Sequence, residues 1–394
     1  MLEHLKDQPA DKILALMAAF RADPRDDKVD LGVGVYKDAT GNTPVMRAVK
    51  EAERRLVAEQ TTKAYTGLAG DPAFSDAMID LILGGVVPRE RIAAVATPGG
   101  TGAIRQALEL IKLAAPEATV WLSDPTWPNH PSIIKYLGMP TANYRYFDDA
   151  TRGVDFAGLM ADLGTVASGD VVLLHGCCHN PTGADLSNEQ WDQIADLALE
   201  RGFIPFIDTA YQGLGNGLNE DAYGMRMMAE RLPELVIASS CSKNFGLYRE
   251  RTGSITFIAE NPQQVDIVAS QAMSIARQIY SMPPAHGALL VSLILGDDQL
   301  RANWQAELEE VRLRIKSMRS LLTSGIQGNL AGIDFSHIEQ QNGMFSFLGI
   351  SSAQLERLRE EFGIYIVSST RVNLAGINSS NIGYISESMN TVLK

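Results

Sequence analysis

The sequence predicts an α/β protein with a mainly parallel sheet covered by helices on both faces, together with a smaller α+β lobe. Three observations carry this prediction. Short apolar runs alternate with helical patterns through the middle of the chain, which is typical of parallel strands buried on both faces. After about residue 300, a long helical pattern is followed only by short strand-like runs. At 394 residues, the chain is also too long for one small core.

Six apolar runs are predicted as strands, in chain order: Ile92–Ala96, Thr119–Leu122, Val171–Leu174, Phe203–Ile207, Leu235–Ala238 and Ser254–Ile258. Residues 102–114 and 188–202 repeat apolar side chains at helical spacing between these strands. A helix over 302–324 leads out of the sheet region, and Met344–Leu348 and Tyr365–Val367 follow as shorter strands. The first forty or so residues precede the regular alternation, so we expect them to join the second lobe.

Charge and hydropathy exclude several classes of protein. With 34 basic and 47 acidic side chains the net charge is −13, which argues against nucleic acid or an anionic membrane as the main partner. No run of 18 apolar residues is present, so no transmembrane helix is predicted. The first residues have neither the pattern of a secretory signal nor that of a transit peptide. We therefore expect a cytoplasmic protein.

The chain has three cysteines, Cys177, Cys178 and Cys241, which are too few and too clustered for a disulfide framework. The adjacent pair next to His179 raises the question of a metal site. A second pair of ligands at zinc-finger spacing is missing. We therefore predict buried thiols and no metal.

One stretch, 235-LVIASSCSKNFGLYRERTG-253, places a lysine just beyond an apolar strand. Most lysines are solvated surface residues, and that interpretation stays open for Lys243. The alternative is a nucleophilic amine beside an anion site, because the serine hydroxyls, the backbone N–H groups and one of the two arginines, Arg249 or Arg251, can hold a phosphate. A lysine in such a cationic, partly buried site has a lowered pKa and can form a Schiff base.

Other predicted strands also end in polar motifs. The segment 97-TPGGTGAIRQ-106 combines glycines with a helix start, which suits a phosphate, although the motif taken alone favours a plain strand–helix turn. Trp127 in 123-SDPTWPNH-130 follows the next strand, and its indole can stack on a flat ligand or simply pack. Asn180 in 175-HGCCHNPTG-183 lies in turn chemistry that leaves its amide available.

The fourth motif, 203-FIPFIDTAYQG-213, ends an apolar strand with Asp208, and Tyr211 supplies a phenol three residues later. A carboxylate in apolar surroundings is costly unless it is paired, and a protonated ring nitrogen would be a suitable partner. In a parallel sheet, ligands bind beyond the carboxyl ends of the strands. Pyridoxal phosphate uses an acidic partner for its ring, a lysine and a phosphate cradle together. We therefore predict this cofactor.

The order of GVYKD, TPGGTGA, PTWPNH, HGCCHNPTG, DTAYQG, SCSKNFGLYRERTG, RQIYSMPPAHG and a late Ser-Thr-Arg resembles the aspartate/aromatic aminotransferase family, from about Leu31 to Arg371. The resemblance implies the type I fold of pyridoxal-phosphate-dependent transferases, with a seven-stranded, mainly parallel sheet. It also implies an N-terminal arm and part of the small domain over 1–43, a large cofactor domain over 44–311 and a small domain over 312–394.

The resemblance assigns a role to each motif residue. Lys243 is the Schiff-base and proton-transfer residue, Asp208 pairs with the pyridine nitrogen, and Tyr211 donates to the ring oxygen. The other cofactor-binding residues that it implies are Asn180, Trp127, His130, Gly100, Thr101, Ser240, Ser242, Arg251 and, in 63-KAYTG-67, Tyr65. The implied substrate-binding residues are Arg371, Arg277, Gly34, Trp127 and Asn180. Tyr65 and Arg277 would act on the partner subunit of a homodimer with shared active sites.

Specificity rests on two departures from the aspartate-selective pattern. Ala64 and Met282 stand where aspartate-selective members usually carry asparagine, which makes the pocket wall less polar and more adaptable. Four residues keep the aspartate-type pattern: Val35, Lys37, Thr43 and Thr101. We therefore expect transfer of amino groups from aromatic amino acids and from aspartate or glutamate to 2-oxo acids such as 2-oxoglutarate. Strict dicarboxylate preference is the alternative.

Two other classes share this fold. A transcriptional sensor is disfavoured because no basic DNA-binding segment accompanies this acidic chain. A lyase or decarboxylase is disfavoured because both carboxylate-binding arginines, Arg277 and Arg371, are present, whereas a decarboxylase must let the α-carboxylate depart.

Overall fold

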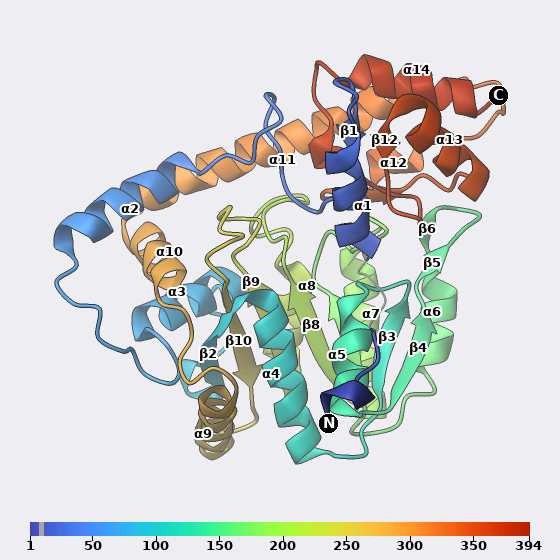
Figure 1. The fold of residues 1–394 in the computed structure, drawn as a ribbon. Coiled ribbons are helices and arrows are strands. Elements are labelled where there is room, and N and C mark those ends of the chain that lie inside the picture. The colour runs from blue at the N-terminus through green and yellow to red at the C-terminus, as the bar shows by residue number, and fades with distance from the viewer. Residues whose placement is uncertain (8–11) are drawn as a thin grey trace. The chain divides into compact units, whose positions relative to one another are not determined.

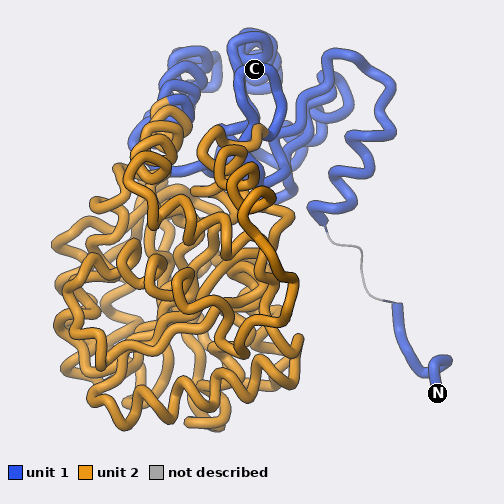
Figure 2. Tube along the Cα trace, turned by 90° about the vertical axis from the view of Figure 1, so that its left-hand side faces the viewer, with its two compact units in different colours: residues 1–43, 314–394 blue, residues 44–313 orange. Residues whose placement is uncertain are grey.

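The computed structural model describes residues 1–7 and 12–394 (Figure 1). The chain divides into two units, coloured separately in Figure 2. The small unit contains Met1–Thr43 and Arg314–Lys394, and the large unit contains Pro44–Leu313. The two ends of the chain therefore contribute to the same unit. Among the described residues, no helix has the length and apolar character needed to cross a membrane.

A seven-stranded sheet forms the centre of the large unit, in the order β2-β10-β9-β8-β7-β3-β4. Its strands are β2 (Ile92–Pro98), β3 (Val120–Asp124), β4 (Thr141–Arg145), β7 (Val171–His175), β8 (Ile204–Thr209), β9 (Leu235–Ser240) and β10 (Thr252–Ile258). Strand β10 runs in the direction opposite to the other six strands of this sheet. The six strands predicted individually and the mainly parallel sheet are confirmed. Strand β4 is missing from the individual predictions because this edge strand is mostly exposed and lacks a continuous apolar run.

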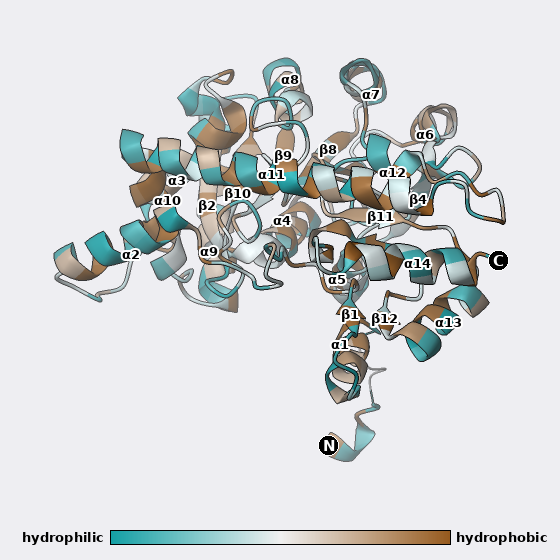
Figure 3. Ribbon diagram, turned by 90° about the horizontal axis from the view of Figure 1, so that it is seen from above, coloured by the Kyte–Doolittle hydropathy of each residue, from teal (hydrophilic) through white to brown (hydrophobic). Residues whose placement is uncertain are grey.

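Helices cover both faces of the sheet, as Figure 3 shows from above. One face carries α4 (Gly99–Ala114), α5 (Asn129–Leu137) and α9 (Pro262–Ile279). The other carries α3 (Pro72–Leu83), α6 (Phe156–Leu163), α7 (Asn188–Arg201) and α8 (Tyr223–Arg231). The unit also contains α2 (Arg47–Glu59), η2 (Arg89–Arg91), α10 (His286–Gly296) and the paired strands β5 (Phe147–Asp148) and β6 (Gly153–Val154).

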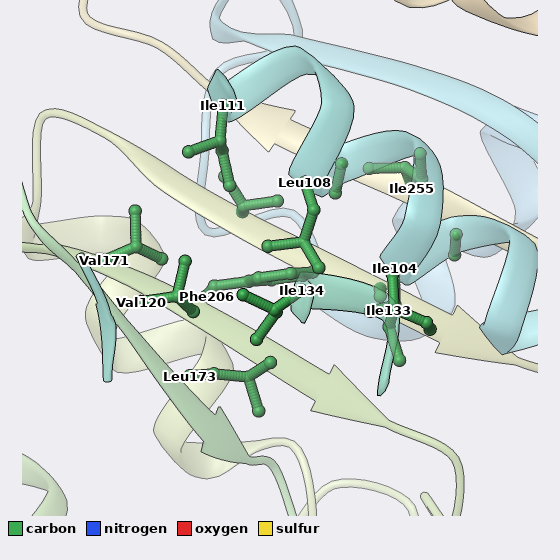
Figure 4. Packing of buried hydrophobic residues seen from close by; sticks show 14 of the residues in the cluster. Ile104, Leu108, Ile111, Val120, Ile133, Ile134, Val171, Leu173, Phe206 and Ile255 are labelled. Carbon is green, nitrogen blue, oxygen red and sulfur yellow. The ribbon is translucent and has the colours of Figure 1, made fainter. Parts of the chain in front are cut away.

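The contact between α4 and the sheet positions the start of this helix. Ile104, Leu108 and Ile111 recur at helical spacing on one side of α4 and pack with Phe206 of β8 and Leu173 of β7 (Figure 4). All five side chains are buried. Because α4 begins directly after β2 ends, its first turn is held at the edge where the parallel strands terminate.

The small unit has its own core and two short sheets. Strand β1 (Val29–Asp30) pairs in parallel with β12 (Ile364–Tyr365), and β11 (Phe345–Phe347) pairs antiparallel with β13 (Arg371–Asn373). Its helices are η1 (Leu2–His4), α1 (Lys12–Ala22), α12 (His337–Gln340), α13 (Ser352–Phe362), η3 (Leu374–Gly376) and α14 (Ile382–Val392). The long helix α11 (Asp298–Ile326) belongs partly to each unit.

Candidate active site

A cavity opens in the large unit where β7, β8 and β9 end, and ten of the predicted cofactor-binding residues line it. These are Gly100, Thr101, Trp127, Asn180, Asp208, Tyr211, Ser240, Ser242, Lys243 and Arg251. They converge because the strands that precede them lie side by side in parallel, with His175 opposite Asp208 and Asp208 opposite Ala238. The strand-end motifs therefore meet at one place.

Four further residues line the cavity that were not predicted to bind cofactor or substrate, namely Ile104, His175, Cys177 and Ala210. His175 and Cys177 belong to the same sequence motif as Asn180, so this motif could have indicated that they lie at the site. Ile104 lies three residues after Thr101 on α4, where helical spacing alone would have placed it on the same side.

Asp208 lines the cavity and is hydrogen-bonded to His130. The Nε2 atom of His130 lies 3.0 Å from Oδ2 of Asp208, and its Nδ1 lies 2.8 Å from Oγ1 of Thr126. Thr126 in turn lies 3.1 Å from Nε2 of His175. Burial is the largest single effect and by itself would raise the pKa of Asp208, but the hydrogen bond from His130 together with nearby positive charges, those of His130 and Lys243 among them, outweighs it, so the pKa is lowered. This carboxyl is therefore kept ionised.

Burial keeps the second histidine of this chain of contacts, His175, uncharged. It lowers the pKa of His175 to about 3, with a smaller contribution from the nearby His130. His175 is therefore neutral at physiological pH. It lines the cavity as an uncharged imidazole while Asp208 carries the negative charge.

Lys243 lies three residues beyond the end of β9, with Nζ 5.1 Å from the centroid of the Tyr211 ring. Burial lowers the pKa of Lys243 to about 8; the charge of Asp208 opposes this shift and that of Arg251 adds to it. A substantial fraction of the amine is therefore neutral slightly above neutral pH. A neutral amine is the form that can act as a nucleophile or accept a proton.

Another group of residues lining the cavity suits an anion. Residues Gly99 and Gly100 start α4, and a Cβ on Gly100 would lie 3.0 Å from Cβ of Ser240. Gly99 has φ +71°, and a Cβ there would collide with the Arg251 guanidinium. Only glycine therefore allows this close approach. The helix N-terminus, the guanidinium and the hydroxyls of Ser240 and Ser242 are suitable donors for a phosphate.

Two predicted residues lie on the surface of the large unit and do not line the cavity. The Tyr65 side chain is 90% exposed. Arg277, near the end of α9, is also exposed and donates a hydrogen bond to Oγ of Ser281. Both were predicted to serve the partner subunit, so their place outside their own chain's cavity does not contradict that prediction.

Arg371 and Gly34 belong to the small unit. Arg371 is buried in β13, where its Nη2 donates to the carbonyl oxygen of Gly32 at 2.9 Å. Its guanidinium carbon lies 4.2 Å from the centroid of the Phe345 ring. A Cβ on Gly34 would lie 3.0 Å from Cζ of the same ring. Phe345 therefore packs against both predicted substrate-binding residues and orients the guanidinium.

Comparison with known proteins agrees with this geometry. Residues 26–389 match the family model "Aminotransferase class I and II". An aromatic-amino-acid aminotransferase of Paracoccus denitrificans is 53% identical over 97% of both chains, and an aspartate aminotransferase of Haemophilus influenzae is 48% identical over the full length of both. The crystal structure of a Burkholderia pseudomallei aromatic-amino-acid aminotransferase, described as covalently bound to pyridoxal phosphate, aligns over 100% of both chains with a TM-score of 0.98 and 39% identity.

The chain belongs to the class I and II aminotransferase family. It has the type I fold of pyridoxal-phosphate-dependent transferases, and it is an enzyme of the transferase class. The resemblance drawn from the order of the sequence motifs is thereby confirmed.

Proposed function

We propose that this protein is a pyridoxal-phosphate-dependent transaminase of aromatic amino acids that also accepts aspartate and glutamate, with 2-oxo acids such as 2-oxoglutarate as acceptors. The observation that carries the proposal is that one cavity is lined by Lys243, by an ionised carboxylate, Asp208, and by the anion-binding groups around Arg251. The relatives named as aromatic-amino-acid and aspartate aminotransferases support both substrate classes.

The donor set fits the cofactor at both ends. A phosphate requires several donors and close backbone approach, which the glycines at the start of α4 and the Arg251 guanidinium supply. A protonated pyridine nitrogen requires an ionised carboxylate, which the contact with His130 maintains at Asp208. Trp127 lines the cavity and offers a flat face to a ring. When bound, pyridoxal phosphate supplies a ring that stabilises negative charge at the α-carbon of the substrate.

In this proposal the catalytic residues divide the work of proton transfer. Lys243 Nζ would accept the proton from the α-carbon of the amino acid and deliver a proton to the aldehyde-derived carbon of the cofactor (C4′), since its lowered pKa favours a neutral amine. Asp208 holds the proton of the ring nitrogen. Tyr211 and Asn180 both line the cavity and would donate hydrogen bonds to the ring oxygen of the cofactor. Two half-reactions at one site give ping-pong kinetics.

Substrate specificity is assigned to residues outside this cavity. Arg371 would clamp the α-carboxylate with two parallel hydrogen bonds, which fixes the orientation of the Cα–H bond. Arg277 of the partner subunit would pair with the distal carboxylate of aspartate or glutamate. The less polar residues Ala64 and Met282 are the reason to expect aromatic substrates as well.

The exposure of Tyr65 and Arg277 is consistent with the proposal that each reaches the active site of a second copy of the chain in a homodimer. A cytoplasmic location is part of the same proposal. The three cysteines are free thiols buried in the fold, as is usual in a reducing compartment.

The test is a comparison of kcat/KM for phenylalanine and for aspartate on one preparation of the cofactor-loaded enzyme, with 2-oxoglutarate as acceptor. Turnover of both amino acids is the expected result. Turnover of aspartate alone would replace the proposal by a strict aspartate aminotransferase. Turnover of neither, in protein shown to hold the cofactor, would remove both.

A further inference from the structure

Two cysteines and a carboxylate meet behind the cavity wall. Cys177 and Cys178 follow β7, and Asp221 lies just before α8, in the segment that follows β8. Because β7 and β8 are neighbouring parallel strands, the segments beyond their carboxyl ends are brought together. The two sulfur atoms and one carboxylate oxygen all lie within 4.8 Å of one another, and all three residues are buried.

The carboxylate of Asp221 is held in a fixed orientation. Its Oδ2 accepts hydrogen bonds from the backbone N–H groups of Gly213 at 2.8 Å and Gly215 at 2.9 Å, and its Oδ1 accepts one from Asn216 at 2.7 Å. A Cβ on Gly215 would lie 2.6 Å from Oδ1, so the loop can close around this carboxylate only with glycine there. Oδ2 thereby uses both of its lone pairs, whereas Oδ1 accepts this one hydrogen bond and has a second lone pair.

The cysteines are also positioned by their backbone. The N–H of Cys178 donates to Oδ2 of Asp185 at 2.9 Å, and Cys178 adopts φ +51°, a left-handed conformation that is unusual for a residue with a side chain. Hydrogen bonds around ligand-bearing residues hold such groups ready for a metal ion.

We propose that Cys177, Cys178 and Asp221 form a binding site for one thiophilic divalent cation. Sulfur ligands select soft cations, and the carboxylate adds a negative charge. On binding, each thiol loses one proton to solvent and forms one sulfur–metal bond, with no change of oxidation state. Cys177 also lines the cavity, so the proposed cation site borders the cofactor site.

This site differs from the one weighed on the sequence alone. In the sequence, the candidate third ligand beside the two cysteines was His179, and no metal was predicted. In the fold, the ring of His179 is engaged elsewhere, with Nε2 3.1 Å from Oγ of Ser123 and Nδ1 2.9 Å from Oγ1 of Thr182. The third ligand is instead Asp221, which reaches the cysteines only through the pairing of β7 and β8.

The proposal is tested with Cd²⁺ on the cofactor-loaded enzyme. Equilibrium dialysis measures the number of ions bound, and the ultraviolet charge-transfer absorption of sulfur–cadmium bonds reports the ligands. We expect one Cd²⁺ per chain with thiolate absorption in the wild type, and loss of both signals in Cys177→Ser and in Cys178→Ser. Cys241→Ser is the matched control, because Cys241 is also buried in the large unit but lies outside the cluster, so its variant should bind as the wild type does.

Asp221→Asn tests the carboxylate. It should keep the thiolate absorption but weaken Cd²⁺ binding by at least about tenfold, in the range seen when partners of a metal site are removed. Absence of thiolate absorption in the wild type would overturn the proposal, as would wild-type binding in Cys178→Ser or equal loss in Cys241→Ser. Unchanged affinity in a folded Asp221→Asn variant would overturn the three-ligand site. Because the cysteine variants leave the loop around Asp221 intact, they test cation binding at this site even if Asp221→Asn does not fold.

Discussion

Replacing Asp208 with alanine tests the role given to the buried carboxylate. Its side chain is 12% exposed and is hydrogen-bonded to His130, so it would face the protonated ring nitrogen of the cofactor in a largely water-free site. Removing one member of a buried ion pair costs about 3–5 kcal/mol. Since 1.36 kcal/mol corresponds to a factor of ten in rate, kcat/KM should fall by a factor of about 10² to 10⁴.

The matched control is His130→Ala, which keeps the carboxylate and removes a single hydrogen bond of 3.0 Å to it. A hydrogen bond to a charged group contributes about 1.5–3 kcal/mol, so the loss should be smaller, at most about a hundredfold. Both variants would be assayed by steady-state transamination, with cofactor content measured separately by absorbance. A loss below tenfold in Asp208→Ala, or equal losses in the two variants, would refute a direct role of Asp208.

Four further predictions concern the lysine and the partner subunit. Lys243→Ala should retain the cofactor but lose nearly all transamination, and activity within tenfold of wild type would exclude the proton-transfer role. In the folded, cofactor-free protein the pKa of Lys243 is about 8, below its ordinary value of 10.5. Between these two pH values, Lys243 is more protonated in the unfolded chain than in the folded one. The free energy of unfolding of the wild type, measured by urea unfolding, should therefore rise with pH in this window when compared with that of Lys243→Met. A difference between the two proteins that does not change with pH would contradict the lowered pKa. Mixing inactive Lys243→Ala chains with Arg277→Ala chains should restore aspartate turnover, because a mixed dimer contains one intact site; no recovery despite verified subunit exchange would place Arg277 within its own chain's site. Arg277→Ala alone should lower kcat/KM for aspartate, with a loss of about 2–5 kcal/mol in transition-state stabilisation, and should leave kcat/KM for phenylalanine nearly unchanged. Equal losses for the two substrates would assign Arg277 another role.

Much of this protein could be predicted from sequence because its signals are local. Strands buried on both faces must be almost continuously apolar, and this revealed six of the seven strands in the sheet. The strand rule then placed Lys243, Asp208 and Asn180 at one edge without any distance being known. The same rule explains the failure at Thr141–Arg145, since an edge strand is exposed on several sides and lacks the apolar run.

The sequence by itself therefore determined the fold class, the family and the residues at the strand ends. The tertiary structure alone decided their physical state. The contact of His130 with Asp208 joins residues 78 positions apart and keeps the carboxyl ionised, while burial lowers the pKa of Lys243. The approach of Asp221 to the two cysteines is likewise a product of strand pairing. Charge state and ligand geometry depend on distances and desolvation between remote segments, and only the packed chain sets these quantities.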